Sequence, residues 1–360
     1  MVANARLAGG FTYVGRATRV VFGIGAIRSL GDEIERLGLE RVLVLATPEQ
    51  RETALEIASS MRGRIGGVFS EARMHVPADV AARARAYAGE IGADGALAIG
   101  GGSTVGLGKA IALETGLPLV AVPTTYAGSE MTTIYGLTEH AVKVTGRDER
   151  VLPKTVVYDP ALTVSLSPAL SASSGFNAIA HAVEALYAID GNPIVTLMAE
   201  ESIRALGGAL PLVVQAPHDL EARSACLYGA WLAGTVLGAV SMALHHKLCH
   251  TLGGTFDLPH AQTHAVVLPY VAAFNAPSVP EAMARVARAL GVADAVEGLR
   301  TLSQALDAPS SLREIGMRAE DLDRAAELAV TVPYPNPRPF DRAEIRALLE
   351  RAYGGSVVAA

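Results

Sequence analysis

Cysteine is nearly absent from this 360-residue sequence, which contains only Cys226 and Cys249. Two thiols cannot build the disulfide framework of a small secreted domain, and they suit a reducing compartment. Residues 1–6 also lack the basic stretch and apolar core of a signal peptide. We therefore expect a cytoplasmic protein.

An excess of basic charge is also missing, because 30 Lys and Arg residues against 36 Asp and Glu residues give a net charge of −6. A nucleic acid would require clustered positive charge, so we expect no such partner. The one long uncharged run, residues 225–244, is long enough to span a bilayer. Its three glycines and the lack of a second such segment favour a buried helix, and we expect no membrane span.

The first half of the chain alternates apolar runs with helical segments. Residues 19–23, 41–46, 95–99 and 119–123 read as strands, while residues 26–37, 82–91 and 105–114 have helical periodicity. This alternation predicts a doubly wound, mostly parallel α/β fold that binds a dinucleotide.

Beyond Asp159-Pro160 the pattern is helical as far as Tyr353. We predict an NAD(P)-binding α/β domain at residues 1–162 and an all-α catalytic domain at residues 163–360. Ligand sites concentrate between domains, so we expect the active site in the interdomain cleft.

Two loops at predicted strand ends favour a nucleotide site. The turn Gly100-Gly101-Gly102-Ser103 precedes a helix, where backbone N–H groups and the helix dipole attract phosphate. The next strand ends in a loop with the hydroxyls of Thr124, Thr125, Tyr126 and Ser129. Each loop alone is also compatible with an ordinary tight turn or with hydroxyls that bond their own backbone. Two at neighbouring strand ends favour binding.

A carboxylate for the adenosine ribose is missing where the strand 41–46 ends, because that position is Thr47, with Glu49 two residues later. A 2′-phosphate would not be repelled by Thr47, so we expect NADPH to be used as well as NADH. Lys143, which follows the hydroxyl loop, is a further candidate cofactor contact.

Four histidines have the spacing of a site. His181 lies four residues after Asn177, His250 lies four after His246, and His260 follows. Residues i and i+4 share a helix face. Three histidines with a carboxylate would suit a divalent metal, but Asn177 is a neutral amide. The pattern therefore predicts chemistry that needs no Lewis acid. The remaining histidines, including His245 and His264, are interpreted as structural.

Two basic residues are candidates for binding an anionic substrate. Lys247 lies inside the histidine cluster, and Arg338 lies in the proline-rich segment Tyr334-Pro335-Asn336-Pro337-Arg338-Pro339, which cannot be helical. An arginine on a rigid loop suits a carboxylate, although a solvated surface arginine is an equal alternative.

These features together resemble the iron-containing alcohol dehydrogenase superfamily and, within it, the maleylacetate reductases. The resemblance covers nearly the whole chain and is carried by Phe22-Gly23-Ile24-Gly25, Gly100-Gly101-Gly102-Ser103, Pro123-Thr124-Thr125, Gly128-Ser129-Glu130 and Asp159-Pro160. In metal-dependent members an aspartate and three histidines bind the metal, at positions that here are Asn177, His181, His246 and His260. His250 falls where the family has a histidine near the nicotinamide. Asn177 and Gly106 depart from the dehydrogenase pattern and match the reductases.

The resemblance implies an oxidoreductase that acts on a CH–CH bond. It would reduce the carbon–carbon double bond of maleylacetate, a small dicarboxylate, to 3-oxoadipate in the breakdown of resorcinol- or hydroxyquinol-type compounds, with NADH or NADPH. It also implies a homodimer. We expect no metal requirement; if a metal binds, His181, His246 and His260 would hold it. His246 is the favoured proton donor, and Tyr126 is the rival.

Three alternatives stay open. The chain could be a metal-dependent alcohol dehydrogenase of the same scaffold, with zinc on three histidines and a water. It could be a non-catalytic nucleotide-binding sensor, which the retained polar residues disfavour. A lyase like dehydroquinate synthase is disfavoured because that chemistry depends on the metal that Asn177 weakens.

Overall fold

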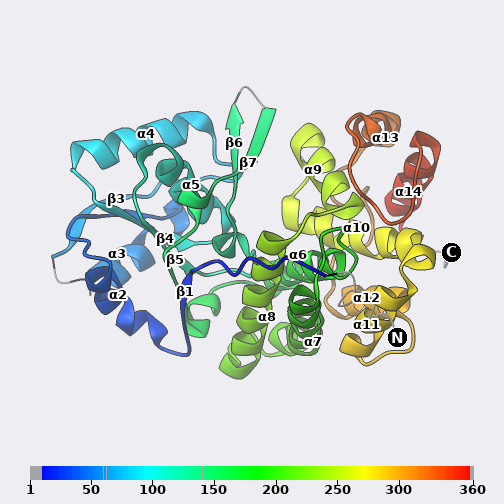
Figure 1. Cartoon of the computed structure of the whole chain (residues 1–360), viewed down its shortest axis with the longest axis horizontal. Coiled ribbons are helices and arrows are strands. Elements are labelled where there is room, and N and C mark those ends of the chain that lie inside the picture. Colours follow the sequence, from blue (N-terminus) through cyan, green and yellow to red (C-terminus); the bar gives the residue numbers. More distant parts are fainter. Residues whose placement is uncertain (1–9, 60, 62, 140–141, 357–360) are drawn as a thin grey trace. The chain divides into compact units, whose positions relative to one another are not determined.

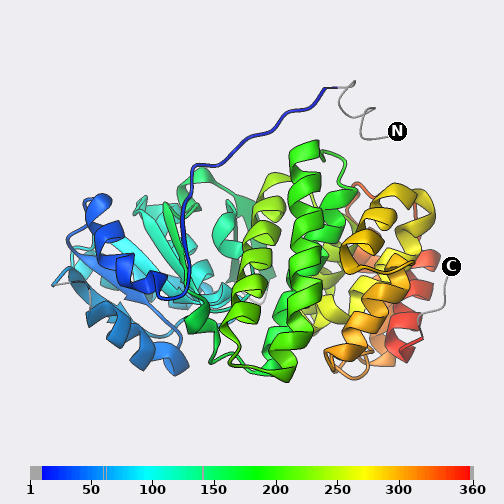
Figure 2. The same cartoon turned by 90° about the horizontal axis from the view of Figure 1, so that it is seen from below.

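The computed structural model describes residues 10–59, 61, 63–139 and 142–356. These residues form two compact units, drawn in Figures 1 and 2. One unit is α/β and comprises residues 15–166. The other is helical and comprises the chain from Ser167 onward together with residues 10–14.

A six-stranded parallel sheet forms the centre of the α/β unit (Figure 1). The strand order is β1-β8-β5-β4-β2-β3. Its strands are β1 (Arg19–Phe22), β2 (Val42–Leu45), β3 (Ile65–Phe69), β4 (Gly95–Gly100), β5 (Leu119–Pro123) and β8 (Thr155–Tyr158). The central strands β2, β4, β5 and β8 are buried along their whole length, which explains their nearly continuous apolar sequences.

Helices cover both faces of this sheet, as the doubly wound prediction requires. On one face α2 (Leu30–Arg36) and α3 (Arg51–Ser59) share a core with Val44 and Ile99. On the other face lies α5 (Gly102–Thr115), where a Cβ on Gly108 would come within 2.6 Å of Leu119. Glycine therefore lets α5 pack closely on the sheet, and α4 (Ala78–Glu90) packs beside α5.

Some elements of the α/β unit were not predicted from the sequence. Strand β3 has the sequence IGGVF, in which two glycines weaken the apolar pattern. The antiparallel hairpin β6 (Ile134–Glu139) and β7 (Val142–Arg147) was also missed. The predicted helix at residues 26–37 begins as a 3-10 turn. Short 3-10 turns are η1 (Ala26–Ser29), η2 (Pro48–Gln50), η3 (Ser129–Met131), η4 (Glu149–Val151) and η5 (Pro160–Thr163).

The second unit is all-α in its described part, as predicted. Its long helices α6 (Pro168–Leu186), α7 (Pro193–Gln215) and α8 (Leu220–Ala239) pack against one another (Figure 1). Two more, α9 (Leu244–Phe256) and α10 (His260–Asn275), share a core with α13 (Leu322–Val330) and α14 (Arg342–Gly354). The remaining elements are η6 (Ala276–Ser278), α11 (Pro280–Leu290), α12 (Ala295–Ala305) and η7 (Ala319–Asp321).

The uncharged run at residues 225–244 is divided between helices. Helix α8 ends at Ala239, and α9 begins at Leu244 at an angle of 97°. No single helix in the described residues is long and apolar enough to cross a membrane, and the bent pair α8 and α9 meets that test by length and composition only. Helix α8 also carries Trp231, whose ring lies 6.1 Å from that of Tyr228.

Candidate active site

The glycine-rich turn between β4 and α5 has the geometry of a phosphate site. Gly100 has a φ of +147°, and Gly101 is the N-cap of α5 without a side-chain cap. A Cβ on Gly101 would lie 2.8 Å from Thr125 Cγ2, so only glycine lets the two loops approach so closely. The uncapped N–H groups of the first helical turn are therefore available to an anion. That Gly100, Gly101, Gly102, Ser103, Thr124, Thr125 and Ser129 bind the cofactor stays a prediction.

The hydroxyl loop is fastened to α5 by Lys109, a residue that the sequence analysis missed. Lys109 is fully buried, and its Nζ donates to the carbonyls of Ser129 (2.6 Å), Thr132 (2.8 Å) and Ile134 (2.7 Å) and to Thr132 Oγ1 (2.9 Å). Burial lowers the pKa of Lys109 to about 7, while nearby Glu130 opposes the shift. The only sequence signal was a lysine inside an otherwise apolar helix face.

Glu130 has a second buried partner. The hydroxyl of Tyr158, at the end of β8, donates to Glu130 Oε1 at 2.7 Å. Burial raises the pKa of the Glu130 carboxyl. On the same strand end, Asp159 accepts hydrogen bonds from the backbone N–H groups of Gly25 (3.0 Å) and Ile27 (3.1 Å). The buried side chains of Glu130, Tyr158 and Asp159 therefore hold the loops at the carboxyl ends of the sheet in place.

Thr47 makes a side-chain hydrogen bond with the exposed Glu49 carboxylate, which lowers the pKa of Glu49. That Thr47 faces the adenosine ribose, and that NADPH is used as well as NADH, stay predictions. The side chain of Lys143 lies outside the described residues. Tyr126 is fully buried in this unit.

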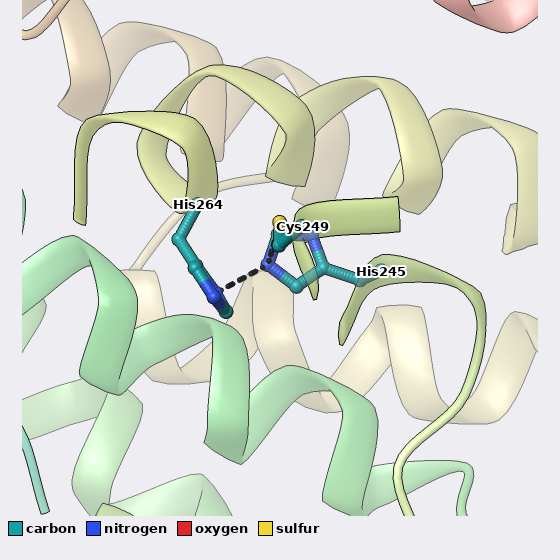
Figure 3. Close-up of side chains that lie close together, drawn as sticks. All are labelled: His245, Cys249 and His264. Atoms are coloured by element: carbon teal, nitrogen blue, oxygen red, sulfur yellow. Dashed lines mark hydrogen bonds between the residues drawn. The ribbon is translucent and has the colours of Figure 1, made fainter. Parts of the chain in front are cut away.

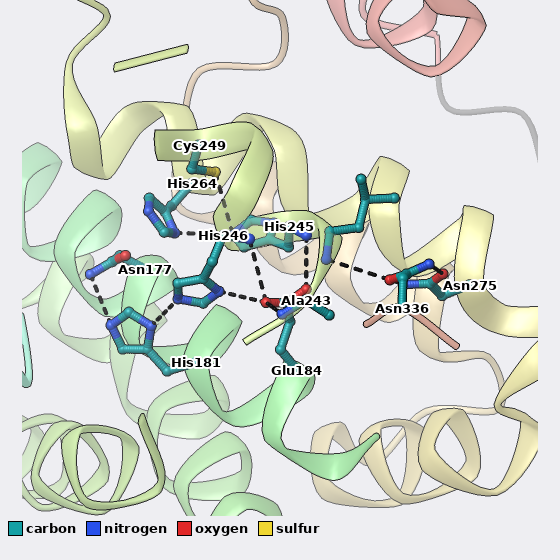
Figure 4. A network of polar contacts seen from close by, with 11 residues as sticks. Asn177, His181, Glu184, Ala243, His245, His246, Cys249, His264, Asn275 and Asn336 are labelled. Carbon is teal, nitrogen blue, oxygen red and sulfur yellow. Dashed lines mark hydrogen bonds and ion pairs between the residues drawn. The ribbon is translucent and has the colours of Figure 1, made fainter. Parts of the chain in front are cut away.

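In the helical unit, α6 and α9 build a ladder of hydrogen bonds (Figure 4). Asn177 Nδ2 lies 3.4 Å from His181 Nε2, and His181 Nδ1 lies 2.7 Å from His246 Nε2. His246 Nδ1 in turn lies 2.7 Å from Glu184 Oε2. The spacing of Asn177, His181 and Glu184 along α6 places all three on one face. Both ring nitrogens of His246 are therefore occupied, which weakens its assignment as the proton donor.

Glu184 is the second residue that the sequence analysis missed. It is fully buried, and it accepts hydrogen bonds from the backbone N–H groups of Ala243 (2.9 Å) and His245 (2.8 Å), with a longer contact from His246 (3.4 Å). These groups begin α9, where the helix dipole favours a carboxylate. In the sequence, Glu184 was indicated only by its position three residues after His181, which places both on one face of the helix.

His250 and His260 lie on the outer side of the ladder. His250 is exposed and His260 is half-buried, whereas Asn177, His181 and His246 are buried. The rings of His250 and His260 are 6.3 Å apart and nearly parallel, and His250 lies 6.3 Å from His246. The four predicted histidines and Asn177 are thus in one neighbourhood of the helical unit. The interdomain position of the active site stays a prediction.

A second histidine pair, His245 and His264 (Figure 3), lies beside the ladder (Figure 4). His245 Nε2 is 3.0 Å from His264 Nδ1 and 3.6 Å from Cys249 Sγ, and these donor atoms lie within 4.8 Å of one another. The outer nitrogens, His245 Nδ1 and His264 Nε2, have no hydrogen-bond partner in the described chain. Histidines that bind metal normally donate that second N–H, so we interpret the pair as hydrogen-bonded and metal-free. Burial lowers the pKa of both imidazoles.

The family-type metal set does not fit a cation as it lies here. Asn177 offers no anionic oxygen, and its Oδ1 has no partner among the described residues. His181 and His246 point ring nitrogens at each other at 2.7 Å, a hydrogen-bond distance that leaves no room for an ion between them. Across the described residues, the only three histidine, cysteine or acidic donors that come this close together are those of His245, Cys249 and His264.

The two basic candidates differ in their surroundings. Arg338 donates to the Phe274 carbonyl at 3.1 Å and to Glu344 Oε1 at 3.1 Å, and it lies 4.1 Å above the Phe274 ring. Lys247 Nζ lies 5.9 Å from the Tyr334 ring centroid and has no carboxylate partner within the described chain. Arg338 therefore holds its own loop, and Lys247 is better placed to take an external anion.

Known proteins are similar to this chain over nearly its whole length. The iron-containing alcohol dehydrogenase family model matches residues 17–160, and that of the C-terminal part of the Fe-containing alcohol dehydrogenase family matches residues 171–353. A maleylacetate reductase of Burkholderia cepacia is 58% identical over 96% of this chain and 98% of its own. The crystal structure of a maleylacetate reductase from a Rhizobium strain has a TM-score of 0.93 at 52% identity, covering 96% of this chain and 99% of its own. A putative alcohol dehydrogenase from Ralstonia eutropha has a TM-score of 0.95 at 60% identity, covering 96% and 98%. The chain therefore belongs to the iron-containing alcohol dehydrogenase family, in its maleylacetate reductase branch.

Proposed function

We propose that this protein reduces the carbon–carbon double bond of maleylacetate to give 3-oxoadipate, with hydride from a nicotinamide cofactor and without a metal. Its sequence identity to maleylacetate reductases extends over nearly the whole chain and supports maleylacetate as the substrate. The observation that carries the metal-free reaction is the direct contact of His181 with His246, beside a neutral Asn177.

The chemistry agrees with this site. Hydride addition at the carbon β to the ketone leaves an enolate, whose charge rests on the former carbonyl oxygen. Hydrogen-bond donors aimed at that oxygen stabilise the transition state, and loss of one such donor typically costs about 10²–10³ in rate. A saturated ketone has no such delocalisation, so alcohol dehydrogenases depend more on a Lewis acid.

The proton for the enolate requires a donor that can reach it. His246 was favoured from the sequence, but its two ring nitrogens are bonded to Glu184 and His181. Because His250 is exposed and His260 is half-buried, we assign proton donation to these two outer histidines, with Tyr126 retained as the rival. The buried end of the proposed site is then lined by His181, His246 and Asn177.

Cofactor and substrate carboxylates complete the proposal. The phosphates of the cofactor bind the N-terminus of α5, and Glu49 beside Thr47 favours NADH over NADPH. Lys247 pairs with one carboxylate of the substrate, and Arg338 serves mainly its own loop. We also propose a cytoplasmic homodimer that acts in the breakdown of resorcinol- or hydroxyquinol-type compounds.

The decisive experiment is NADH oxidation with maleylacetate before and after exhaustive chelation, together with metal analysis of the protein. Full activity in chelated protein supports the metal-free reaction. Activity that disappears and returns with zinc or iron would overturn it. Turnover of simple alcohols instead of maleylacetate would favour the metal-dependent dehydrogenase, and nicotinamide binding without any turnover would favour the sensor.

A further inference from the structure

The direction of every hydrogen bond in the ladder follows from Glu184. This buried carboxylate already accepts backbone N–H groups at the start of α9, and it can only accept from His246. His246 must therefore carry its proton on Nδ1, which leaves Nε2 as an acceptor. His181 then donates from Nδ1 to His246 Nε2, and its own Nε2 becomes the acceptor for the Asn177 amide.

Counting protons shows why position 177 matters. The ladder has three contacts, and each requires one proton between its two heavy atoms. Two neutral histidines supply two of these protons, and the amide of Asn177 supplies the third. A carboxylate at position 177 would place an acceptor at both ends. The ladder would then need one additional proton or a bound cation.

We infer that Glu184 is a positioning residue that fixes both His246 and His181 in the Nδ1–H tautomer, and that Asn177 and Glu184 together complete the ladder without a cation. Glu184 acts through His246 and touches no substrate. The geometry, with Glu184 fully buried and 2.7 Å from His246 Nδ1, carries this role. The inference rests on the proposed function only for its kinetic test, because the tautomers and the metal content are measured without substrate.

The experiment combines nitrogen-15 NMR of histidine-labelled enzyme with metal analysis. In the wild-type protein, His181 and His246 should both give the Nδ1–H pattern, assigned by comparison with His181→Gln and His246→Gln. In Glu184→Leu no acceptor faces His246 Nδ1, so the Nδ1–H preference of both imidazoles should be lost. Asn177→Asp, purified with zinc present, should either retain about one zinc per chain or hold one additional proton, seen as a doubly protonated imidazole, whereas the wild-type protein should do neither.

Asp190→Asn is the matched control, because Asp190 accepts from Ser241 N (2.8 Å) just before α9 but touches no histidine. Glu184→Leu should lose roughly 10- to 100-fold in kcat, as is typical for a residue that orients a site histidine, with little change in KM. Asp190→Asn should keep kcat and both tautomers. Wild-type histidines in the Nε2–H form, or an Asn177→Asp protein with neither zinc nor a doubly protonated imidazole, would overturn the inference even if Glu184→Leu fails to fold. Inactivity of the wild-type protein towards maleylacetate would instead refute the proposed function alone.

Discussion

At the scale of single residues, hydrogen bonds to neighbouring groups determine the role that a side chain can take. His246 fitted a proton donor by its position in the sequence, yet hydrogen bonds at both ring nitrogens make it part of a fixed frame. Arg338 likewise fitted a carboxylate ligand but is committed to Phe274 and Glu344. Residue type and spacing predicted which residues gather, but they could not show which atoms remain available.

The charge at Glu49 gives a test of cofactor preference. Removing it by Glu49→Gln should raise kcat/KM for NADPH by roughly two- to fivefold while leaving NADH nearly unchanged, because an exposed charge acts weakly. Steady-state kinetics with both cofactors measures this. Glu52→Gln, an exposed change in the first turn of α3, is the control and should alter neither value. Equal responses of the two variants would show that Glu49 does not face the ribose.

Lys247 and Arg338 can be separated by substitution with methionine. Lys247→Met should raise KM for maleylacetate roughly tenfold with a small change in kcat, as expected for loss of a charge-assisted hydrogen bond. Arg338→Met should instead lower the melting temperature, because its loop loses contacts to Phe274 and Glu344. If the Arg338 variant shows the larger rise in KM, the carboxylate contact belongs to Arg338 and not to Lys247.

At the scale of elements, the apolar runs predicted β2, β4 and β5 because strands buried on both faces need continuous apolar sequence, whereas the buried strand β8 was missed. The sequence patterns did not predict the elements that depend on pairing or packing with other parts of the fold. β3 is a strand despite two glycines because it pairs with β2. In the hairpin β6–β7, Thr138 contacts His75 and Pro77, which are distant in sequence. The hydroxyl loop was predicted by its composition, but its support by Lys109 arises only when α5 packs beneath it.

Lys109 predicts a pH dependence of stability. Its pKa is about 7 in the folded protein, below the ordinary value of 10.5, so between these pH values the unfolded chain holds a proton that the folded chain has released. The free energy of unfolding should therefore rise with pH in this range, by about 1 kcal/mol per pH unit. Urea unfolding of the wild type and Lys109→Met between pH 7.5 and 9.5 compares the slopes. Identical slopes would mean that the four acceptors keep the amine charged throughout.

At the scale of the whole molecule, the two units carry different sets of candidate site residues. The loops that fit a nucleotide belong to residues 15–166, and the histidine ladder belongs to the helical unit. The sequence predicted this division because the hydrophobic period changes near Asp159-Pro160. It could not show that residues 10–14 group with the helical unit, because that assignment depends on contacts far along the chain.

Ligands should therefore protect different segments from hydrogen exchange. NADH should slow exchange at residues 100–104 and 124–130, and the product 3-oxoadipate should slow it in α6 and the first turn of α9, because a ligand stabilises the groups it binds. Mass spectrometry of exchanged peptides measures both. Protection by 3-oxoadipate confined to the α/β unit would place the substrate away from the ladder and contradict the assignment of the histidines.

Trp231 turns the helical unit into its own optical reporter. It is the only tryptophan of the chain and lies in α8, so emission excited selectively at the indole comes from this unit alone. Circular dichroism, in contrast, averages over both units. A fluorescence melt that departs from the dichroism melt would reveal that the two units lose structure in separate steps, and NADH could then be added to identify which step belongs to the nucleotide-binding part.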